Sequence, residues 1–169
     1  MYQVGEHVMY RNVGICIIEA IGKLCFSMEK EDDYYTLCPV SAKDKSKFYV
    51  PIDTDTSMRN VISSQEAGQY LTELEKMQTK PFCAKKTAEL AAHYDELMEK
   101  QDLISHLIMF KELCQKEEKV TKSGKKLGQL ELKYKYQIEK LLVDEFSYAL
   151  KETPELMKER LYKEVCINS

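Results

Sequence analysis

The chain has 169 residues, enough for one domain of generous size or two small ones. Hydrophobic residues make up 44% and charged residues 31%, a balance that is typical of globular proteins and argues against disorder. The net charge of −3 argues against attraction of nucleic acid by the whole molecule, and the apolar runs are too short for a membrane span. No basic region followed by an apolar core opens the sequence, so no secretory signal is visible and we expect a cytoplasmic protein.

The first sixty residues have the pattern of short strands. Four strands are predicted, at residues 6–10, 15–21, 34–40 and 47–52. Pro39 ends the third strand or places it at an edge, because proline cannot donate a ladder hydrogen bond. Glycines stand where tight bends are needed, at Gly5, Gly14 and Gly22. Strands so short and so closely spaced predict a small β barrel.

Beyond residue 60 the apolar residues recur at helical spacing. Ser63 to Glu66 has the pattern of a capping box at the start of the first helix. Four helices are predicted around residues 67–77, 90–98, 103–114 and 127–149, with a loop at 120–126 before the longest of them. Thr153 and Pro154 begin a last short helix. The fold class is therefore α+β, with a β domain at residues 1–58 and an all-α domain at 59–169.

Catalytic and metal-binding patterns are missing from the sequence. The six cysteines are Cys16, Cys25, Cys38, Cys83, Cys114 and Cys166, and no two of them form a CxxC pair. We interpret them as free thiols rather than as zinc ligands. A catalytic cysteine with a distant histidine stays open as an alternative, but no motif supports it. We expect no enzyme activity, no metal and no cofactor.

One predicted strand is a candidate for binding a protein. Phe48, Tyr49 and Val50 combine aromatic and β-branched side chains after a charged loop. The edge of a sheet can bind a partner strand through backbone hydrogen bonds. The alternative is that these residues only complete the barrel.

Lysines are concentrated in the helical half. Between residues 116 and 135, seven lysines stand against three acidic residues. Lysine ammonium groups can contact a phosphate backbone, and an aromatic side chain between cations can wedge into a minor groove. The candidates for such contacts are Phe82, Lys85, Lys86, Lys122, Lys125 and Lys126. The alternatives are a solvated helix face for the lysines and a place in the helical core for Phe82.

Several stretches resemble one known family. The segment VGEHVMYRNVGICIIEAI at residues 4–21 is similar to the opening of the bacterial CarD-like transcription regulators, which runs V-G-D-x-V-x-Y, a short turn, then G-V/I-x-x-I. Residues 34–40 and 50–53 resemble the next two signatures, and Arg59 to Ser63 resembles the R-x-V-I-S before the first helix. The resemblance covers most of residues 1–75 and is looser over residues 102–150.

The resemblance implies a Tudor/SH3-like β barrel that binds the β subunit of RNA polymerase; the transcription-repair coupling factor uses a similar barrel. It implies that the helical domain contacts promoter DNA non-specifically at the upstream edge of the transcription bubble and modulates the stability of the open complex. By position, the residues that would bind polymerase are Lys23, Lys47, Phe48, Tyr49 and Val50. Residues 119–126 resemble the basic inter-helix loop of the family, and residues 142–146 resemble its last long helix.

The chain departs from the family in one respect. Better-known members place a tryptophan near the DNA-binding helices as a minor-groove wedge, and this chain has no tryptophan. Phe82 stands at the equivalent place but lacks an indole N–H donor. The helical half also contains only one arginine, Arg160, and lysine is the poorer bidentate ligand for bases and phosphates. The alternative function is therefore a polymerase-binding adaptor of the same fold that has lost DNA binding.

Overall fold

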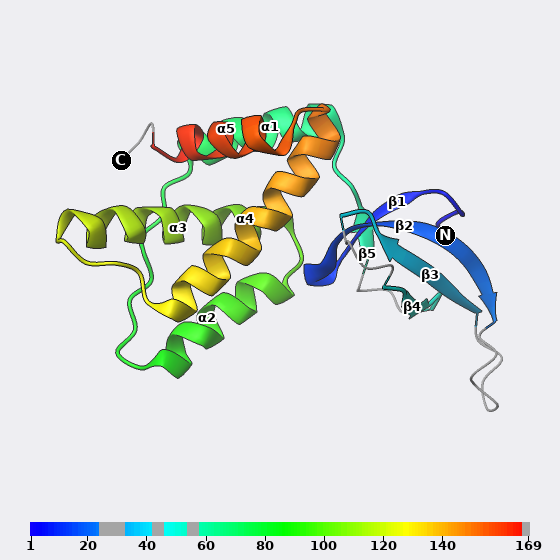
Figure 1. Cartoon of the computed structure of the whole chain (residues 1–169), viewed down its shortest axis with the longest axis horizontal. Coiled ribbons are helices and arrows are strands. Elements are labelled where there is room, and N and C mark those ends of the chain that lie inside the picture. The colour runs from blue at the N-terminus through cyan, green and yellow to red at the C-terminus, as the bar shows by residue number, and fades with distance from the viewer. Residues whose placement is uncertain (24–32, 42–45, 54–57, 167–169) are drawn as a thin grey trace. The chain divides into compact units, whose positions relative to one another are not determined.

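The computed structural model describes residues 1–23, 33–41, 46–53 and 58–166 (Figure 1). The chain divides into two compact units, Met1–Val61 and Ile62–Ser169. The first unit contains the strands and the second contains the helices, so the predicted α+β class is confirmed. Cys25 and most of the predicted polar loop at 41–46 lie outside the described residues.

Among the described residues, five antiparallel strands form one sheet in the order β4-β3-β2-β1-β5 (Figure 1). The strands are β1 (His7–Tyr10), β2 (Gly14–Lys23), β3 (Asp33–Pro39), β4 (Phe48–Pro51) and β5 (Met58–Asn60). The four predicted strands are confirmed, and Pro39 ends β3, which lies inside the sheet rather than at its edge. Over the described residues β4 and β5 are the two edges, and closure of the sheet into a barrel stays a prediction.

The fifth strand begins at the predicted domain boundary. Met58, Arg59 and Asn60 pair with β1, so these residues belong with the sheet and not with the helices. Three residues are too few to show an alternating pattern in the sequence. The turn between β1 and β2 depends on Gly14, whose φ of 98° lies in a region that residues with a Cβ rarely adopt.

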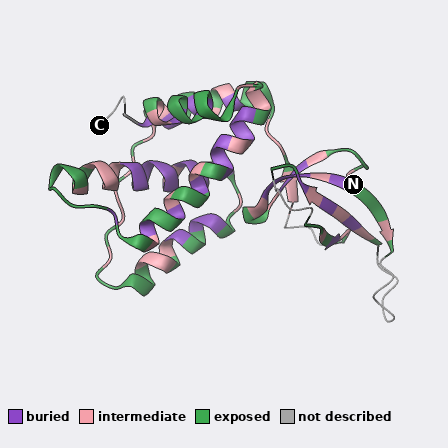
Figure 2. Ribbon diagram, in the orientation of Figure 1, coloured by how far each residue is buried: buried purple, intermediate pink, exposed green. Residues whose placement is uncertain are grey.

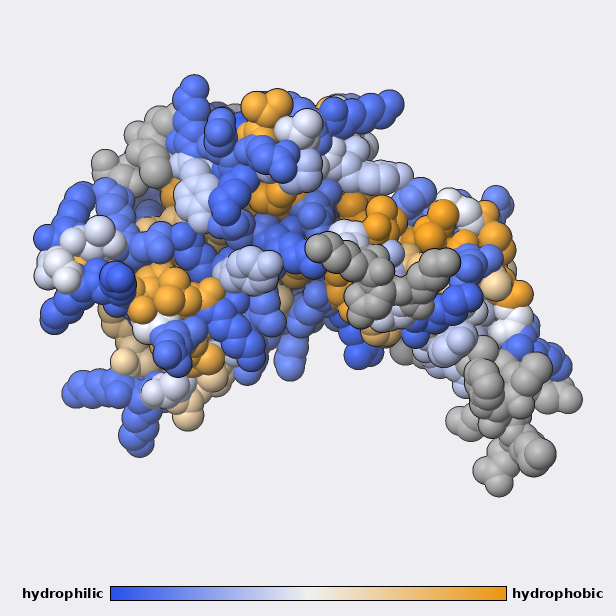
Figure 3. All heavy atoms as spheres, in the orientation of Figure 1, coloured by the Kyte–Doolittle hydropathy of each residue, from blue (hydrophilic) through white to orange (hydrophobic). Residues whose placement is uncertain are grey.

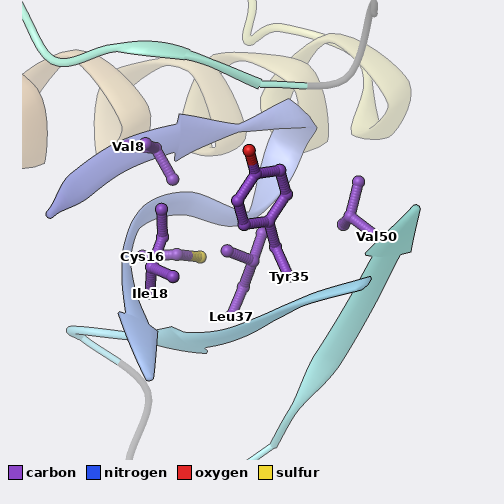
Figure 4. Close-up of a cluster of buried hydrophobic side chains, with 6 residues drawn as sticks. All are labelled: Val8, Cys16, Ile18, Tyr35, Leu37 and Val50. Carbon is purple, nitrogen blue, oxygen red and sulfur yellow. The ribbon is translucent and has the colours of Figure 1, made fainter. Parts of the chain in front are cut away.

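The core of the strand unit consists of six side chains that are nearly or fully buried (Figure 4). They are Val8, Cys16, Ile18, Tyr35, Leu37 and Val50. The backbone N–H of Tyr2 donates to the Tyr35 hydroxyl at 3.1 Å and so ties the start of the chain to this core. Burial raises the pKa of the Cys16 thiol to about 11, so this thiol stays protonated at neutral pH. The cysteines whose side chains are described, Cys16, Cys38, Cys83 and Cys114, are not disulfide-bonded.

Five helices make up the second unit. They are α1 (Ser64–Lys76), α2 (Thr87–Glu99), α3 (Leu103–Lys122), α4 (Gln129–Leu150) and α5 (Pro154–Cys166), and all five were predicted. The loop predicted at 120–126 begins later, because α3 continues to Lys122 and is supported there by an ion pair between Lys122 and Glu118, one turn apart. The chain leaves the helix at Gly124, with a φ of 70°. Lys122 therefore lies in the last turn of α3 rather than in a loop.

Side-chain caps begin three of these helices, as the sequence indicated for two of them. Ser63 and Glu66 form the predicted capping box of α1, in which each side chain bonds the backbone N–H of the other residue. Asp102 accepts a hydrogen bond from the N–H of Ser105 at 2.7 Å and caps α3. Thr153 accepts one from Leu156 at 3.4 Å, ahead of Pro154 in α5. These caps satisfy N–H groups that have no partner inside the helix.

Helices α3 and α4 lie in the middle of the helical unit, with α1 and α5 side by side against them and α2 on the other side (Figure 1). The purple stretches in Figure 2 show that their inner faces are buried. The fully buried side chains of α3 and α4 are Leu107, Met109, Phe110, Leu113, Ile138, Leu142 and Phe146. Lys111 is buried among them, and its ammonium donates to the carbonyl of Leu74 at 2.6 Å, at the end of α1.

The surface of the helical unit is mainly hydrophilic on the side drawn in Figure 3, with hydrophobic side chains in separate patches. In the part of the chain that the structure describes, no helix combines the length and apolarity needed to cross a membrane.

The capping box gives a first prediction about stability. Ser63→Ala should lower the free energy of unfolding of the helical unit by about 1 kcal/mol, because the N–H of Glu66 loses its acceptor. Urea unfolding followed by circular dichroism at the helix wavelength measures the change. Ser64→Ala is the matched control, since Ser64 is the first residue inside the helix and should change the free energy little. Equal effects of the two substitutions would contradict the assigned role of Ser63.

Candidate functional site

The β4 edge strand carries three of the residues predicted to bind a protein, and its side chains alternate between the core and solvent. Val50 is 2% exposed and belongs to the core, whereas Tyr49 is 43% exposed on the other face. Phe48 is half-buried and packs against the same core, with its ring centroid 5.6 Å from that of Tyr10. Of the three side chains, Tyr49 is therefore the one most accessible to a partner.

Two lysines were predicted to flank this strand. Lys47 precedes β4, and its ammonium lies 2.6 Å from a carboxylate oxygen of Glu19 in β2. The hydrogen bond and charge of Glu19 raise the pKa of Lys47. Lys23 is exposed at the end of β2, opposite Asp33 of β3. The structure thus places Lys47 beside Tyr49 and places Lys23 at the far end of the β2–β3 ladder.

The Phe82 ring stacks on His93 of α2. The two ring centroids are 4.0 Å apart and the planes differ by 14°. His93 is in turn fixed by Glu112 of α3, with 2.9 Å between Nε2 and Oε2. Phe82 is half-buried, so the structure gives it neither a place in the helical core nor a fully projecting position.

Lys116 of α3 joins the segment that carries Phe82 to the start of α4. Its ammonium donates to the carbonyl oxygen of Phe82 at 2.8 Å and pairs with the Glu131 carboxylate. The other oxygen of Glu131 accepts from the N–H of Gly128 at 3.0 Å, at the N-terminus of α4. Because Lys116 and Glu131 are only 16% and 9% exposed, this ion pair is shielded from solvent and salt.

The predicted DNA-contacting lysines lie around these two segments. Lys85 and Lys86 are exposed just before α2, and Lys125 and Lys126 are exposed in the short loop between α3 and α4. None of these four forms an ion pair with another described residue. Lys122 differs, because its ammonium lies 2.7 Å from Glu118. Lys116 brings the two segments together, so these cations belong to one end of the helical unit.

Comparison with known families assigns the first unit. Residues 2–62 match the model of the CarD-like/TRCF RID domain and so include all five strands. The strand unit is a CarD-like/TRCF RID domain. The resemblance of the sequence to the CarD-like family is thereby confirmed. The comparison with curated proteins gives no match.

The RID domain indicates a transcription-related protein that interacts with RNA polymerase. All five residues predicted to bind polymerase lie inside the RID domain, and Tyr49 and Lys47 are the most accessible of those around β4. The six residues predicted to contact DNA lie in the helical unit, beyond the match. Within residues 1–23, 33–41, 46–53 and 58–166, no three His, Cys, Asp or Glu side chains are arranged to hold a metal ion.

Sequence reasoning missed the acidic partners of these residues. Glu19 lies between Ile18 and Ala20, where the β2–β3 register shifts, and such a bulge redirects a side chain. Glu112 and Glu131 lie on buried helix faces, so nothing in their local sequence marks them as partners of His93 and Lys116. The one signal in the sequence is helical spacing. Glu112 and Glu131 each stand next to apolar residues that recur every three or four positions, and this places both glutamates near the inward face of their helix.

The buried pair gives a prediction that a double-mutant cycle can check. Glu131→Gln should lower the free energy of unfolding by about 2 kcal/mol, because the Lys116 charge stays buried without its partner. Lys116→Met should do the same, and the double variant should cost at least about 1 kcal/mol less than the sum. Denaturant unfolding of all four proteins gives the coupling energy.

The exposed pair of Lys122 and Glu118 is the control for this cycle. It joins side chains that are 73% and 40% exposed, so its coupling energy should stay below about 0.5 kcal/mol. Additive effects at Lys116 and Glu131 would show that the buried pair does not hold the two segments together.

Proposed function

We propose that this protein is a non-enzymatic transcription regulator that binds the β subunit of RNA polymerase through the β4 edge of its RID domain. In this proposal the RID sheet closes as a Tudor/SH3-like barrel, and the protein acts in the bacterial cytoplasm, where polymerase is found. The helical unit contacts promoter DNA non-specifically and modulates the stability of the open complex.

The proposed binding to RNA polymerase is supported by the RID match over residues 2–62, within which β4 is an edge strand of the described sheet. A partner strand can extend a sheet at such an edge, where backbone hydrogen bonds supply affinity and exposed side chains supply specificity. Tyr49 provides a large amphipathic side chain on the strand, the type that is enriched at protein interfaces. Lys47 lies beside it, with its ammonium paired to Glu19 of β2, so the pair offers a partner a donor and an acceptor together.

The DNA half rests on the exposed lysines of the helical unit. Lys85, Lys86, Lys125 and Lys126 present ammonium groups to solvent, and phosphate contacts of this kind carry no sequence information. Phe82 lies beside them on its His93 stack, where the ring can pack against a distorted base step without leaving the surface of the unit.

The second candidate, an adaptor without DNA binding, is favoured by one observation. Phe82 is held on both sides, by the His93 ring and by Lys116 at its carbonyl, which limits how far it can insert between bases. The test that separates the two candidates is a polarisation titration of labelled forked promoter DNA, with and without RNA polymerase from the same host. A DNA contact that appears with polymerase supports the regulator, and polymerase binding without added DNA contact supports the adaptor.

The polymerase contact is tested at Tyr49. Tyr49→Glu should weaken binding to RNA polymerase about tenfold or more, because it removes an aromatic contact and adds a charge at the strand edge. Val4→Glu is the matched control, since Val4 is also exposed and precedes β1, away from β4 in the sheet order. Both variants should keep the circular dichroism spectrum of the unmodified protein. Equal polymerase affinity of the two variants would rule out the β4 edge.

The DNA contact is tested through its salt dependence. Log affinity falls as log salt concentration rises. Replacing Lys122, Lys125 and Lys126 together by Gln should make this negative slope shallower by about 2 to 3, roughly one for each phosphate that is no longer neutralised. A triple Gln variant of Lys76, Lys100 and Lys163, which are exposed elsewhere on the helices, makes the same change in net charge and should leave the slope unchanged. An unchanged slope in the first variant, with polymerase binding intact, would favour the adaptor.

A further inference from the structure

The ion pairs of the α3–α4 region divide its lysines into two groups. Between Lys116 and Lys140 there are four carboxylates, and each of them is paired with a lysine. The pairs are Glu117 with Lys135, Glu118 with Lys122, Glu131 with Lys116, and Glu139 with Lys158 of α5. Glu139 also accepts a hydrogen bond from the hydroxyl of Tyr162. The negative charges of this region are therefore neutralised by contacts within the unit.

Five lysines of the same stretch are left outside these pairs. They are Lys119, Lys125, Lys126, Lys133 and Lys140, all exposed and none in an ion pair with another described residue. Residues 116–140 contain eight lysines and four glutamates, so their net charge is +4 when all of these groups are ionised. The structure sorts these charges, because the four carboxylates are paired with lysines whereas these five ammonium groups face solvent without an acidic partner among the described residues.

Two of these lysines extend the positive surface along α4. The exposed residues of the first half of the helix are Gln129, Leu132, Lys133, Tyr136, Gln137 and Lys140. No carboxylate is among these six, although Tyr136 and Lys140 border a hollow that Glu139, Asp144 and Glu155 also line. The six recur at spacings of three and four residues, so they form one face. Tyr136 is 69% exposed between the two lysines. From Gln129 to Lys140 the helix rises about 16 Å. We call these six residues the α4 face.

We propose that the α4 face binds the phosphate backbone of double-stranded nucleic acid and continues the contact made by the α3–α4 loop. The inference rests on the proposed DNA contact and adds a second set of residues to it. Duplex DNA carries one charge per about 1.7 Å of axis, so a face of this length runs past several phosphates. The amides of Gln129 and Gln137 and the hydroxyl of Tyr136 add hydrogen-bond donors that phosphate oxygens accept.

The composition of the face favours a nucleic acid over a protein as its partner. Leu132 is its one exposed aliphatic side chain, and a stable protein interface needs a desolvated apolar centre. Lysine is depleted at such centres, whereas it is a common ligand of phosphate. Two lysines with amides and a tyrosine between them fit a hydrated, charged backbone.

The test compares three double variants of the full chain for binding to a labelled duplex DNA of mixed sequence over a series of salt concentrations. The face variant is K133Q/K140Q, the loop variant is K125Q/K126Q, and the control is K76Q/K163Q, which makes the same change in net charge at two exposed lysines that form no ion pair with another described residue. The face variant should make the negative slope of log affinity against log salt shallower by about 2, and the control should leave that slope unchanged. All six of these lysines are exposed, so the variants should fold normally.

Each outcome decides a different point. A shallower slope in the face variant supports the proposal, whether or not the loop variant also changes. A slope equal to that of the control, with a shallower slope in the loop variant, overturns the α4 face and leaves the proposed DNA contact intact. No change in either variant, or no duplex binding by the unmodified protein at the lowest salt, overturns both.

Discussion

The candidate surface of the helical unit depends on one shielded lysine. Lys116 stands on α3 and reaches two segments that are far apart in the sequence, the carbonyl of Phe82 and the carboxylate of Glu131. Thr79 bonds Gln115 one residue earlier, at 2.9 Å, and Lys111 bonds the end of α1 one turn before that. The chain between α1 and α2 is therefore fastened along α3 at three levels. A polar side chain at such a place must find partners, because an unpaired ammonium in a low dielectric is costly.

This arrangement explains why Phe82 is ordered without being buried. Its backbone is held by Lys116, and its ring lies on a histidine that Glu112 fixes from the other side. Since each contact uses a group from the interior of the unit, the outer part of the ring stays available. The Tyr134 hydroxyl donates a hydrogen bond to Asp95 and so joins α4 to α2 nearby, and burial together with this bond raises the pKa of Tyr134 to about 12. The surface is thus built on polar contacts beneath it rather than on its own exposed lysines.

The sequence predicted those features that follow from local chemistry. Capping at Ser63, the proline at the start of α5 and the pattern of the four longer strands all depend on neighbouring residues, and each was confirmed. The strand β5 was missed because three residues, held in place by β1, have no pattern of their own. The end of α3 was placed too early, since the pair of Lys122 with Glu118 outweighed the loop character of the residues that follow.

The identity of the exposed lysines could not be predicted, because it depends on which glutamates reach which lysines across helices. Lys133 and Lys135 are two residues apart in α4, yet Lys135 pairs with Glu117 of α3 and Lys133 faces solvent. This sorting lets a chain with a net charge of −3 present a positive face. In the proposed function the face does not need high affinity of its own. Binding of the RID domain to polymerase would hold it near the promoter at high effective concentration, so weak and salt-sensitive phosphate contacts would suffice only where polymerase is already bound.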